Sequence, residues 1–264
     1  MVLIIIKHNI RQALELLQDI LTQIYIWYKH IFLGNGNNLK NLPVIINNFN
    51  RLTTTKELVD YLYSVGLKKI IILDNQSTYK PLLDYYKVTK AEVIRLDANL
   101  GHLSLWKSGL YDKYKWNFFV YTDSDILPVE ECPDNFMEKF YAILLKNTRI
   151  KKVGFSIKID DLPNHFSFKS QVSDYESKYW KNIKSTDCFE APIDTTFALY
   201  KPFTGLKSGE IYTRLALRVM PPYTIRHKPW YNNTSSLSEE EQYYLTHSNS
   251  SSSIKEQTVG NKIY

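Results

Sequence analysis

The first regular pattern in the chain is a series of short apolar runs separated by segments that can form helices. Four runs are almost wholly apolar and have the length of strands, at residues 43–47, 69–74, 91–96 and 118–121. Continuous apolar strands that alternate with helices are typical of a parallel sheet covered on both faces. Thr54-Thr-Lys-Glu57 has the spacing of a capping box, which predicts a helix start. The pattern therefore predicts an α/β fold with a mostly parallel central sheet flanked by helices.

Residues 10–33 have apolar side chains three or four positions apart, which predicts an amphipathic helix. The stripe consists of Ile10, Leu14, Leu17, Leu21, Ile24, Tyr28 and Ile31. Its partner can be the chain's own domain, a second copy in a homodimer or a membrane surface in peripheral contact, and the sequence leaves all three open. The apolar opening of six residues is too short for a signal peptide or a membrane span.

Polar residues directly follow each predicted strand. The four clusters are Asn48-Phe-Asn-Arg51, Asp74-Asn-Gln-Ser77, Asp97-Ala-Asn-Leu-Gly-His102 and Asp123-Ser-Asp125. The carboxyl ends of parallel strands meet at one edge of a sheet, where ligands bind. We therefore expect a binding site at this edge.

The last of these clusters, Asp123-Ser-Asp125, predicts a metal site. Side chains two positions apart on a strand point to the same side, so the two carboxylates repel each other unless a cation lies between them. Magnesium and manganese take one or two protein carboxylates and complete their shells with water and phosphate oxygens. The alternative is a plain acidic turn after the strand, because Asp is a common turn residue.

Composition limits the classes of partner. A formal net charge of +6 favours anionic ligands. The chain has no zinc-ligand spacing, RNA-binding signature or basic arm, so nucleic acid is not an expected partner. Two cysteines are too few for a disulfide framework, which favours a reducing, cytoplasmic setting.

The order and spacing of these motifs over residues 42–231 resemble the GT-A glycosyltransferases, in particular the family-two-like group that uses nucleotide-diphosphate sugars. The resemblance implies a GT-A, Rossmann-like fold, a sugar donor that is most often a UDP-sugar, and Mn²⁺ or Mg²⁺ as cofactor. It divides the chain into an N-terminal helical extension (1–39), a donor-binding half (40–128), an acceptor-binding and catalytic half (129–231), and a short helix with a flexible polar tail (232–264).

The resemblance also assigns roles at the donor site. Asn48, Phe49 and Asn50 would lie near the base and ribose, Arg51 near ribose or phosphate, and Asp74 would accept a hydrogen bond from the base. Asn99 and Gly101 would form the loop that approaches the donor, and Asp123 would contact ribose or bind the metal through water. Lys107 would follow on a helix that faces the donor, with a solvated helix face as the alternative.

Two residues further along the chain complete the predicted machinery. Asp194 would act as the base that takes the acceptor's proton, and its alternative is a cap that bonds the amides of Thr195 or Thr196. His227 would join Asp123 and Asp125 in the metal shell, with Arg226 and Lys228 placed to meet phosphate. A surface histidine between two basic residues is the competing interpretation of His227.

The resulting hypothesis is a metal-dependent hexosyltransferase that acts on a glycan or lipid-linked acceptor in surface polysaccharide synthesis. Its expected location is the cytoplasm, free or peripheral at the inner face of the membrane. The alternatives are a sugar-nucleotide nucleotidyltransferase, which would need a glycine-rich loop after the first strand, and a non-enzymatic scaffold protein that acts through its N-terminal helix.

Overall fold

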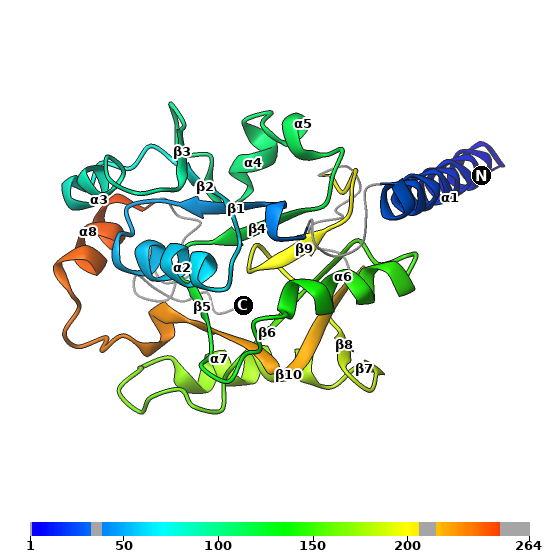
Figure 1. Ribbon diagram of the computed structural model, residues 1–264. Coiled ribbons are helices and arrows are strands. Elements are labelled where there is room, and N and C mark those ends of the chain that lie inside the picture. The colour runs from blue at the N-terminus through cyan, green and yellow to red at the C-terminus, as the bar shows by residue number, and fades with distance from the viewer. Residues whose placement is uncertain (1, 33–38, 206–214, 249–264) are drawn as a thin grey trace.

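The computed structural model of the protein describes residues 2–32, 39–205 and 215–248, together with their side chains except those of residues 2–8, 11, 15 and 32. A single mixed sheet runs through the centre, and helices cover both of its faces (Figure 1). The predicted α/β fold with helices around a central sheet is confirmed. Residues 249–264 of the expected polar tail lie outside the described residues.

The first half of the sheet has the predicted parallel order. It contains β1 (Pro43–Asn48), β2 (Lys69–Asp74), β3 (Glu92–Arg95) and β4 (Phe119–Asp123), in the spatial order β3-β2-β1-β4. All neighbours here are parallel, and Asn48 lies opposite Asp74 while Asn47 lies opposite Asp123. The register therefore brings the polar ends of three strands to one edge.

The second half is largely antiparallel. β9 (Ala198–Tyr200) lies between β4 and β6 (Lys152–Ile157) and is antiparallel to both. β10 (Ala216–His227) is parallel to β6, whereas β8 (Cys188–Glu190) and β7 (Ile183–Ser185) continue the sheet with antiparallel pairs. The short strand β5 (Ile126–Pro128) branches off this order and pairs antiparallel with β10.

Helices and short 3₁₀ turns connect the strands. The helices are α2 (Thr53–Ser64), α3 (Lys80–Tyr85), α4 (Ser104–Lys107), α5 (Tyr111–Tyr114), α6 (Phe136–Lys146), α7 (Lys169–Ser177) and α8 (Glu239–His247). The 3₁₀ turns are η1 (Leu39–Asn41), η2 (Gly101–Leu103), η3 (Lys178–Trp180) and η5 (Lys228–Tyr231). Helix α8 matches the short helix predicted after residue 238.

Each face of the sheet has its own apolar core, because successive strand residues point to opposite faces. Val44 and Ile46 pack in the core that α2 and α6 cover. Ile45 packs in the other core, with Leu105 and Trp106 of α4. Strands that are apolar at every position therefore fill two cores at once, as their sequence pattern predicts.

Helix α1 (Val2–Phe32) extends away from the rest of the chain, and its C-terminal part lies nearest the sheet (Figure 1). Among the described residues, no helix is both long enough and apolar enough to cross a membrane.

Candidate functional site

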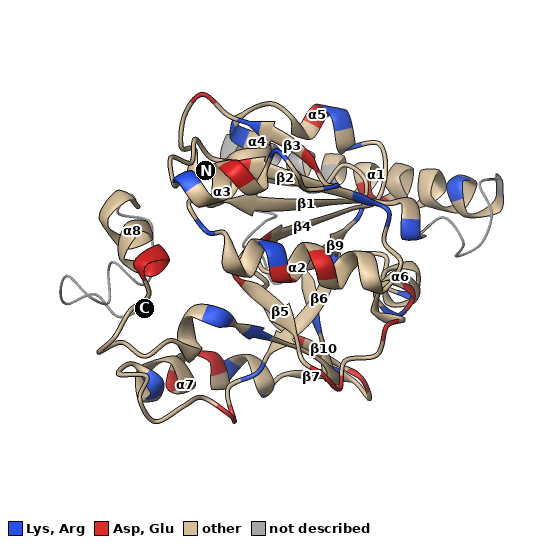
Figure 2. Cartoon of the chain, turned by 60° about the vertical axis from the view of Figure 1, so that its left-hand side comes forward, with Lys and Arg blue, Asp and Glu red and all other residues tan. Residues whose placement is uncertain are grey.

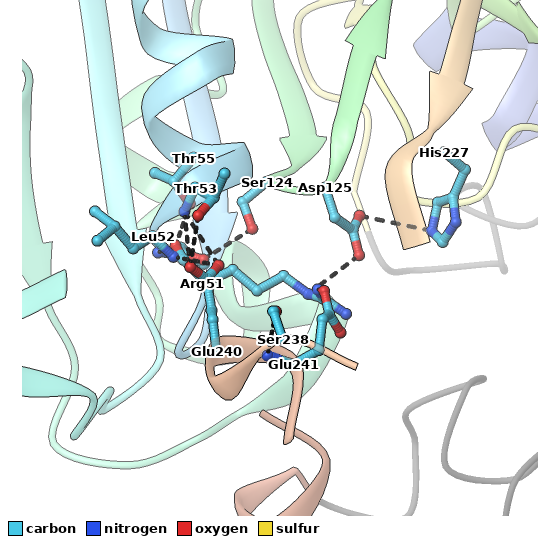
Figure 3. Close-up of polar contacts among 11 residues, drawn as sticks. Arg51, Leu52, Thr53, Thr55, Ser124, Asp125, His227, Ser238, Glu240 and Glu241 are labelled. Carbon is cyan, nitrogen blue, oxygen red and sulfur yellow. Dashed lines mark hydrogen bonds and ion pairs between the residues drawn. The ribbon is translucent and has the colours of Figure 1, made fainter. Parts of the chain in front are cut away.

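The pairing of β5 with β10 brings His227 next to Asp125. Asp123 ends β4, Asp125 precedes β5, and the antiparallel register places Ile126 opposite His227. As a result, the Nε2 atom of His227 lies 3.6 Å from Oδ1 of Asp125 (Figure 3). The backbone N–H of Lys228 also donates to the carbonyl of Asp125, with a donor–acceptor distance of 2.8 Å.

Asp125 and His227 together have the properties of two metal ligands. Among the described residues, neither Oδ1 of Asp125 nor Nδ1 of His227 has a hydrogen-bond partner, although both atoms are buried. Burial lowers the pKa of His227 and outweighs the opposing effect of Asp125. The ring is therefore neutral at physiological pH, which is the form that binds a metal.

Asp123 lies beside this pair in a strongly acidic environment. Burial raises its pKa well above the ordinary value, and the charges of Asp125 and Asp194 raise it further. The hydroxyl of Thr195 donates to Oδ2 of Asp123 at 2.7 Å. In the described part of the chain, no group of three or more His, Cys, Asp or Glu residues is arranged to hold a metal ion. Asp125 and His227 therefore form a pair of possible ligands, and the three-residue group with Asp123 is not found in the ranges that the structure describes.

Arg51 supplies a buried positive charge at the same edge. Its Nε atom lies 3.5 Å from Oδ2 of Asp125, and its Nη1 atom donates to Oε1 of Glu241. The guanidinium carbon lies 3.8 Å from the ring centroid of Tyr244, which is a cation–π contact. Arg51 thus connects Asp125 to helix α8 (Figure 3).

Helix α8 also caps helix α2. The carboxylate of Glu240 accepts hydrogen bonds from the backbone N–H groups of Leu52 and Thr53 and from the hydroxyl of Thr53 (Figure 3). The capping box predicted at residues 54–57 is wrong, because α2 begins at Thr53 and its N-cap, Leu52, offers no side-chain bond. A carboxylate 187 positions away in the sequence satisfies these N–H groups instead.

The predicted base-binding residues Asp74 and Asn48 share a hydrogen-bond partner, the hydroxyl of Tyr86. Asp74 is fully buried and accepts hydrogen bonds from the hydroxyl of Tyr86 at 2.9 Å and from Nε of Arg95 at 3.1 Å. Asn48 donates to the same hydroxyl and accepts from the hydroxyl of Ser124. These bonds fix the ends of β1, β2 and β4 against each other, so Asp74 and Asn48 have a structural role whether or not they meet a base.

Asn50 and Phe49 extend the same edge toward α8. The side-chain carbonyl of Asn50 accepts from the backbone N–H groups of Thr78 and Tyr79 at 2.7 and 3.0 Å. Asn50 has φ of 52°, a left-handed conformation that asparagine tolerates. The ring of Phe49 makes an edge contact with Tyr244 of α8, with centroids 6.3 Å apart.

The predicted loop at Asn99 and Gly101 is held at this edge by Asn75. Oδ1 of Asn75 accepts from the N–H of Leu100 at 3.2 Å, and its Nδ2 donates to the carbonyl of Gly101 at 3.3 Å. Oδ1 of Asn99 accepts from the N–H of Gly101. Lys107 is exposed and donates to the carbonyl of Leu100, so it lies near the loop and not within the buried cluster.

Asp194 is exposed next to this cluster, and a buried lysine holds its backbone. Nζ of Lys152 donates to the carbonyl of Asp194 at 3.0 Å and to the hydroxyl of Tyr200 at 3.2 Å. Lys152 has no exposed surface, and burial lowers its pKa to about 7 despite the opposing effect of Asp194. The carboxylate of Asp194 is left facing outward from a fixed backbone position.

The two basic residues beside His227 are already paired with carboxylates. Arg226 donates to Glu130 at 2.7 Å and to Asp161 at 2.8 Å. Nζ of Lys228 lies 3.1 Å from Oε2 of Glu57. A phosphate contact by Arg226 or Lys228 would have to break these pairs, just as a contact by Arg51 would have to displace Glu241.

Comparison with known proteins gives little beyond this geometry. No protein-family model and no curated protein matches the chain. One similar solved structure is that of "GalNAc-T7 with UDP, GalNAc and Mn2+", with a TM-score of 0.46 and 15% identity over 70% of this chain and 43% of that chain. Another is a mycobacterial protein, with a TM-score of 0.40 and 15% identity over 62% of this chain and 56% of that chain. This chain therefore spans less than two thirds of either protein, and neither likeness assigns it to a family.

Several residues of the site do not stand out in the sequence. Glu240 and Glu241 read only as the acidic first turn of a helix, an arrangement that Figure 2 also shows. Lys152 lies at the start of an apolar strand and gives no sign that it will be buried. Asn75 was within a polar cluster, but only the sheet register shows which loop it holds. No sequence signal links α8 to Arg51.

We expect Lys152→Met to change how stability depends on pH. The pKa of Lys152 is about 7 in the folded chain and 10.5 ordinarily, so between these values the unfolded chain binds a proton that the folded chain lacks. Stability from this residue therefore rises with pH across that interval. Relative to the variant, the wild type should gain roughly 1–2 kcal/mol in free energy of unfolding between about pH 7 and about pH 9, measured by urea denaturation.

The exposed Lys146 provides the matched control. Lys146→Met should keep the wild-type rise. An equal rise in wild type and Lys152→Met would show that Lys152 has an ordinary pKa in the folded protein.

Proposed function

We propose that this protein is a metal-dependent glycosyltransferase that moves a sugar from a nucleotide-diphosphate donor to a glycan or lipid-linked acceptor. The observation that carries the proposal is the meeting of Asp123, Asp125, His227 and Arg51 at one edge of the sheet. These residues come from the ends of β4 and β1 and from β10, and they combine oxygen and nitrogen ligands with a buried cation. The arrangement suits a divalent metal and a diphosphate together.

Asp125 and His227 would hold the metal, and Asp123 would act beside them. Their fit rests on two facing atoms, Oδ1 of Asp125 and Nε2 of His227, which lie 3.6 Å apart, and on the neutral imidazole. Two protein ligands are enough for Mg²⁺ or Mn²⁺, which complete their shells with water and phosphate oxygens. The bound ion would neutralise charge on the departing diphosphate.

Arg51 and the start of α2 would receive the donor's phosphate groups. Both now bind carboxylates of α8, Glu241 at Arg51 and Glu240 at the helix N-terminus. Guanidinium groups and helix N-termini bind phosphate by the same interactions that they use for carboxylates. The carboxylates of α8 would therefore occupy the positions of the donor's phosphate groups. Helix α8 would have to move when the donor binds.

Asp194 would accept the acceptor's proton in an inverting transfer. The acceptor hydroxyl loses its proton to the carboxylate as its oxygen bonds to the anomeric carbon, and the bond from that carbon to the diphosphate oxygen breaks. The electron pair of that bond leaves on the nucleoside diphosphate. Asp194 suits this role because it is exposed while Lys152 fixes its backbone.

Within this proposal the donor is a UDP-sugar, and the setting is surface polysaccharide synthesis in the cytoplasm or at the inner face of the membrane. These finer assignments come from the motif resemblance. The nucleotidyltransferase alternative lacks support, because residues 47–51 after the first strand contain no glycine to let backbone approach a phosphate chain. The scaffold alternative does not account for the buried polar cluster.

Removing the carboxylate of Asp125 should weaken metal-dependent nucleotide binding. We expect Asp125→Ala to weaken UDP binding in the presence of Mn²⁺ by at least about tenfold, because it removes one of two protein ligands. Isothermal titration calorimetry with UDP, with and without Mn²⁺, measures the effect. Asp160→Ala, at an exposed aspartate paired with Lys158, is the control and should bind like wild type. Unchanged Mn²⁺-dependent affinity in Asp125→Ala would disprove the metal site.

Changing the proposed base should affect transfer but not donor binding. We expect Asp194→Asn to lower the rate of sugar transfer by about 100-fold or more, with UDP affinity within about twofold of wild type. A panel of UDP-sugars with simple glycan acceptors gives the rate, and calorimetry gives the affinity. Asp134→Asn, at another exposed aspartate, should retain activity. Full transfer activity in Asp194→Asn would rule out this residue as the base.

Releasing Arg51 from α8 should strengthen donor binding. We expect Glu241→Gln to raise UDP affinity by about threefold to tenfold, because phosphate then no longer competes with a carboxylate for Arg51. Glu239→Gln removes the same charge from the exposed start of α8 and is the matched control. If both variants bind UDP like wild type, the carboxylate of Glu241 does not occupy the phosphate position.

A further inference from the structure

Helix α1 carries a continuous apolar stripe whose side chains are about half exposed to solvent. Its members recur alternately four and three positions apart, which is the heptad spacing of a coiled-coil seam. They are Ile10, Leu14, Leu17, Leu21, Ile24, Tyr28 and Ile31, and each is between 49% and 60% exposed. We call these seven residues the α1 seam.

The opposite side of α1 holds the helix to its own domain. Thr22 and Ile26 are buried there. Nε2 of Gln23 donates to the carbonyl of Thr148, the hydroxyl of Tyr25 donates to the carbonyl of Trp116, and Asp19 pairs with Lys151. The attachment is therefore mainly polar and fixes the direction of the α1 seam, which points away from the domain.

The uncovered surface is large enough to bind another protein chain. Ile20 and Trp27 lie next to the α1 seam and are 48% and 64% exposed. With these two neighbours, the exposed apolar surface is on the order of 1,000 Å², against roughly 800 Å² for each partner of a standard interface. A monomeric protein rarely leaves an apolar patch of this size in water.

The charge pattern and the periodicity distinguish between the candidate partners. Within residues 10–31 the charged residues are Arg11, Glu15, Asp19 and Lys29, two of each sign, whereas helices that lie on anionic membranes carry an excess of Lys and Arg on the polar face. A regular heptad over residues 10–31 is not needed to lie on a lipid surface. It is needed to pack side chains between helices, and an identical helix presents the same spacing.

We propose that the α1 seam packs against α1 of other copies of this chain, so that the protein self-associates through a coiled coil. Leu14 and Leu21 occupy heptad position a, and Ile10, Ile24 and Ile31 occupy most of the d positions. Leu at a with Ile at d favours bundles of more than two helices. The α1 seam is separate from the Asp125 site, so the self-association does not depend on the proposed transferase activity.

A pair of equally exposed leucines allows a matched test with the full chain. Leu21 belongs to the α1 seam and is 57% exposed, whereas Leu16 lies off the seam and is 58% exposed. We expect wild type and Leu16→Glu to sediment as the same oligomer in analytical ultracentrifugation. Leu21→Glu should dissociate to monomers, with a rise of about 100-fold or more in the dissociation constant. Circular dichroism and thermal unfolding check that both variants keep the fold.

Three results would overturn the proposal. The first is a wild-type protein that stays monomeric at about 50 μM, a concentration well above the dissociation constants of specific interfaces. The second is an oligomer that Leu21→Glu leaves intact, and the third is equal disruption by Leu16→Glu. A monomer that binds phosphatidylglycerol vesicles, with binding lost in Leu21→Glu, would assign the α1 seam to a membrane instead.

Discussion

The antiparallel pairing of β5 with β10 is the constraint on which the candidate site depends. Strand β5 has three residues, and its register with β10 fixes His227 beside the residue that precedes the strand. Asp125 therefore meets an imidazole that burial keeps neutral. Without this pairing, Asp125 would lack the neighbouring imidazole of His227.

The second constraint is electrostatic and comes from the C-terminal part of the described chain. The edge of the sheet gathers a buried arginine and a helix N-terminus, both of which attract anions. Glu240 and Glu241 of α8 provide that negative charge within the same chain. The site is thus complementary to an anion, and a competing anionic ligand would act on the position of α8.

Helix α1 differs from the strands in where its apolar side chains lie. The strands bury apolar side chains on both faces of the sheet, whereas α1 is attached through a mainly polar side and leaves its apolar side in solvent. The hydrophobic effect acts on this surface as strongly as on a core. A polar sheet edge and a helix with an exposed apolar face therefore coexist in one chain without sharing residues.

The sequence by itself determined the four parallel strands, the two-sided core and the edge at which the polar strand ends meet. These features are local: continuous apolar runs specify buried strands, and the parallel order specifies which ends coincide. It also determined the α1 seam, because the spacing of apolar residues is visible in the sequence alone. The roles of Asp194 and His227 remain predictions that rest on the motif resemblance and on the geometry described above.

Only the tertiary structure decided how distant residues combine. It replaced the predicted capping box with Glu240, paired Arg226 with Glu130 and Asp161, and placed Glu241 on Arg51. It also directed the α1 seam away from the domain. Each of these outcomes depends on contacts between residues far apart in the chain, and the energy of such contacts depends on burial and distance, which local sequence patterns do not specify.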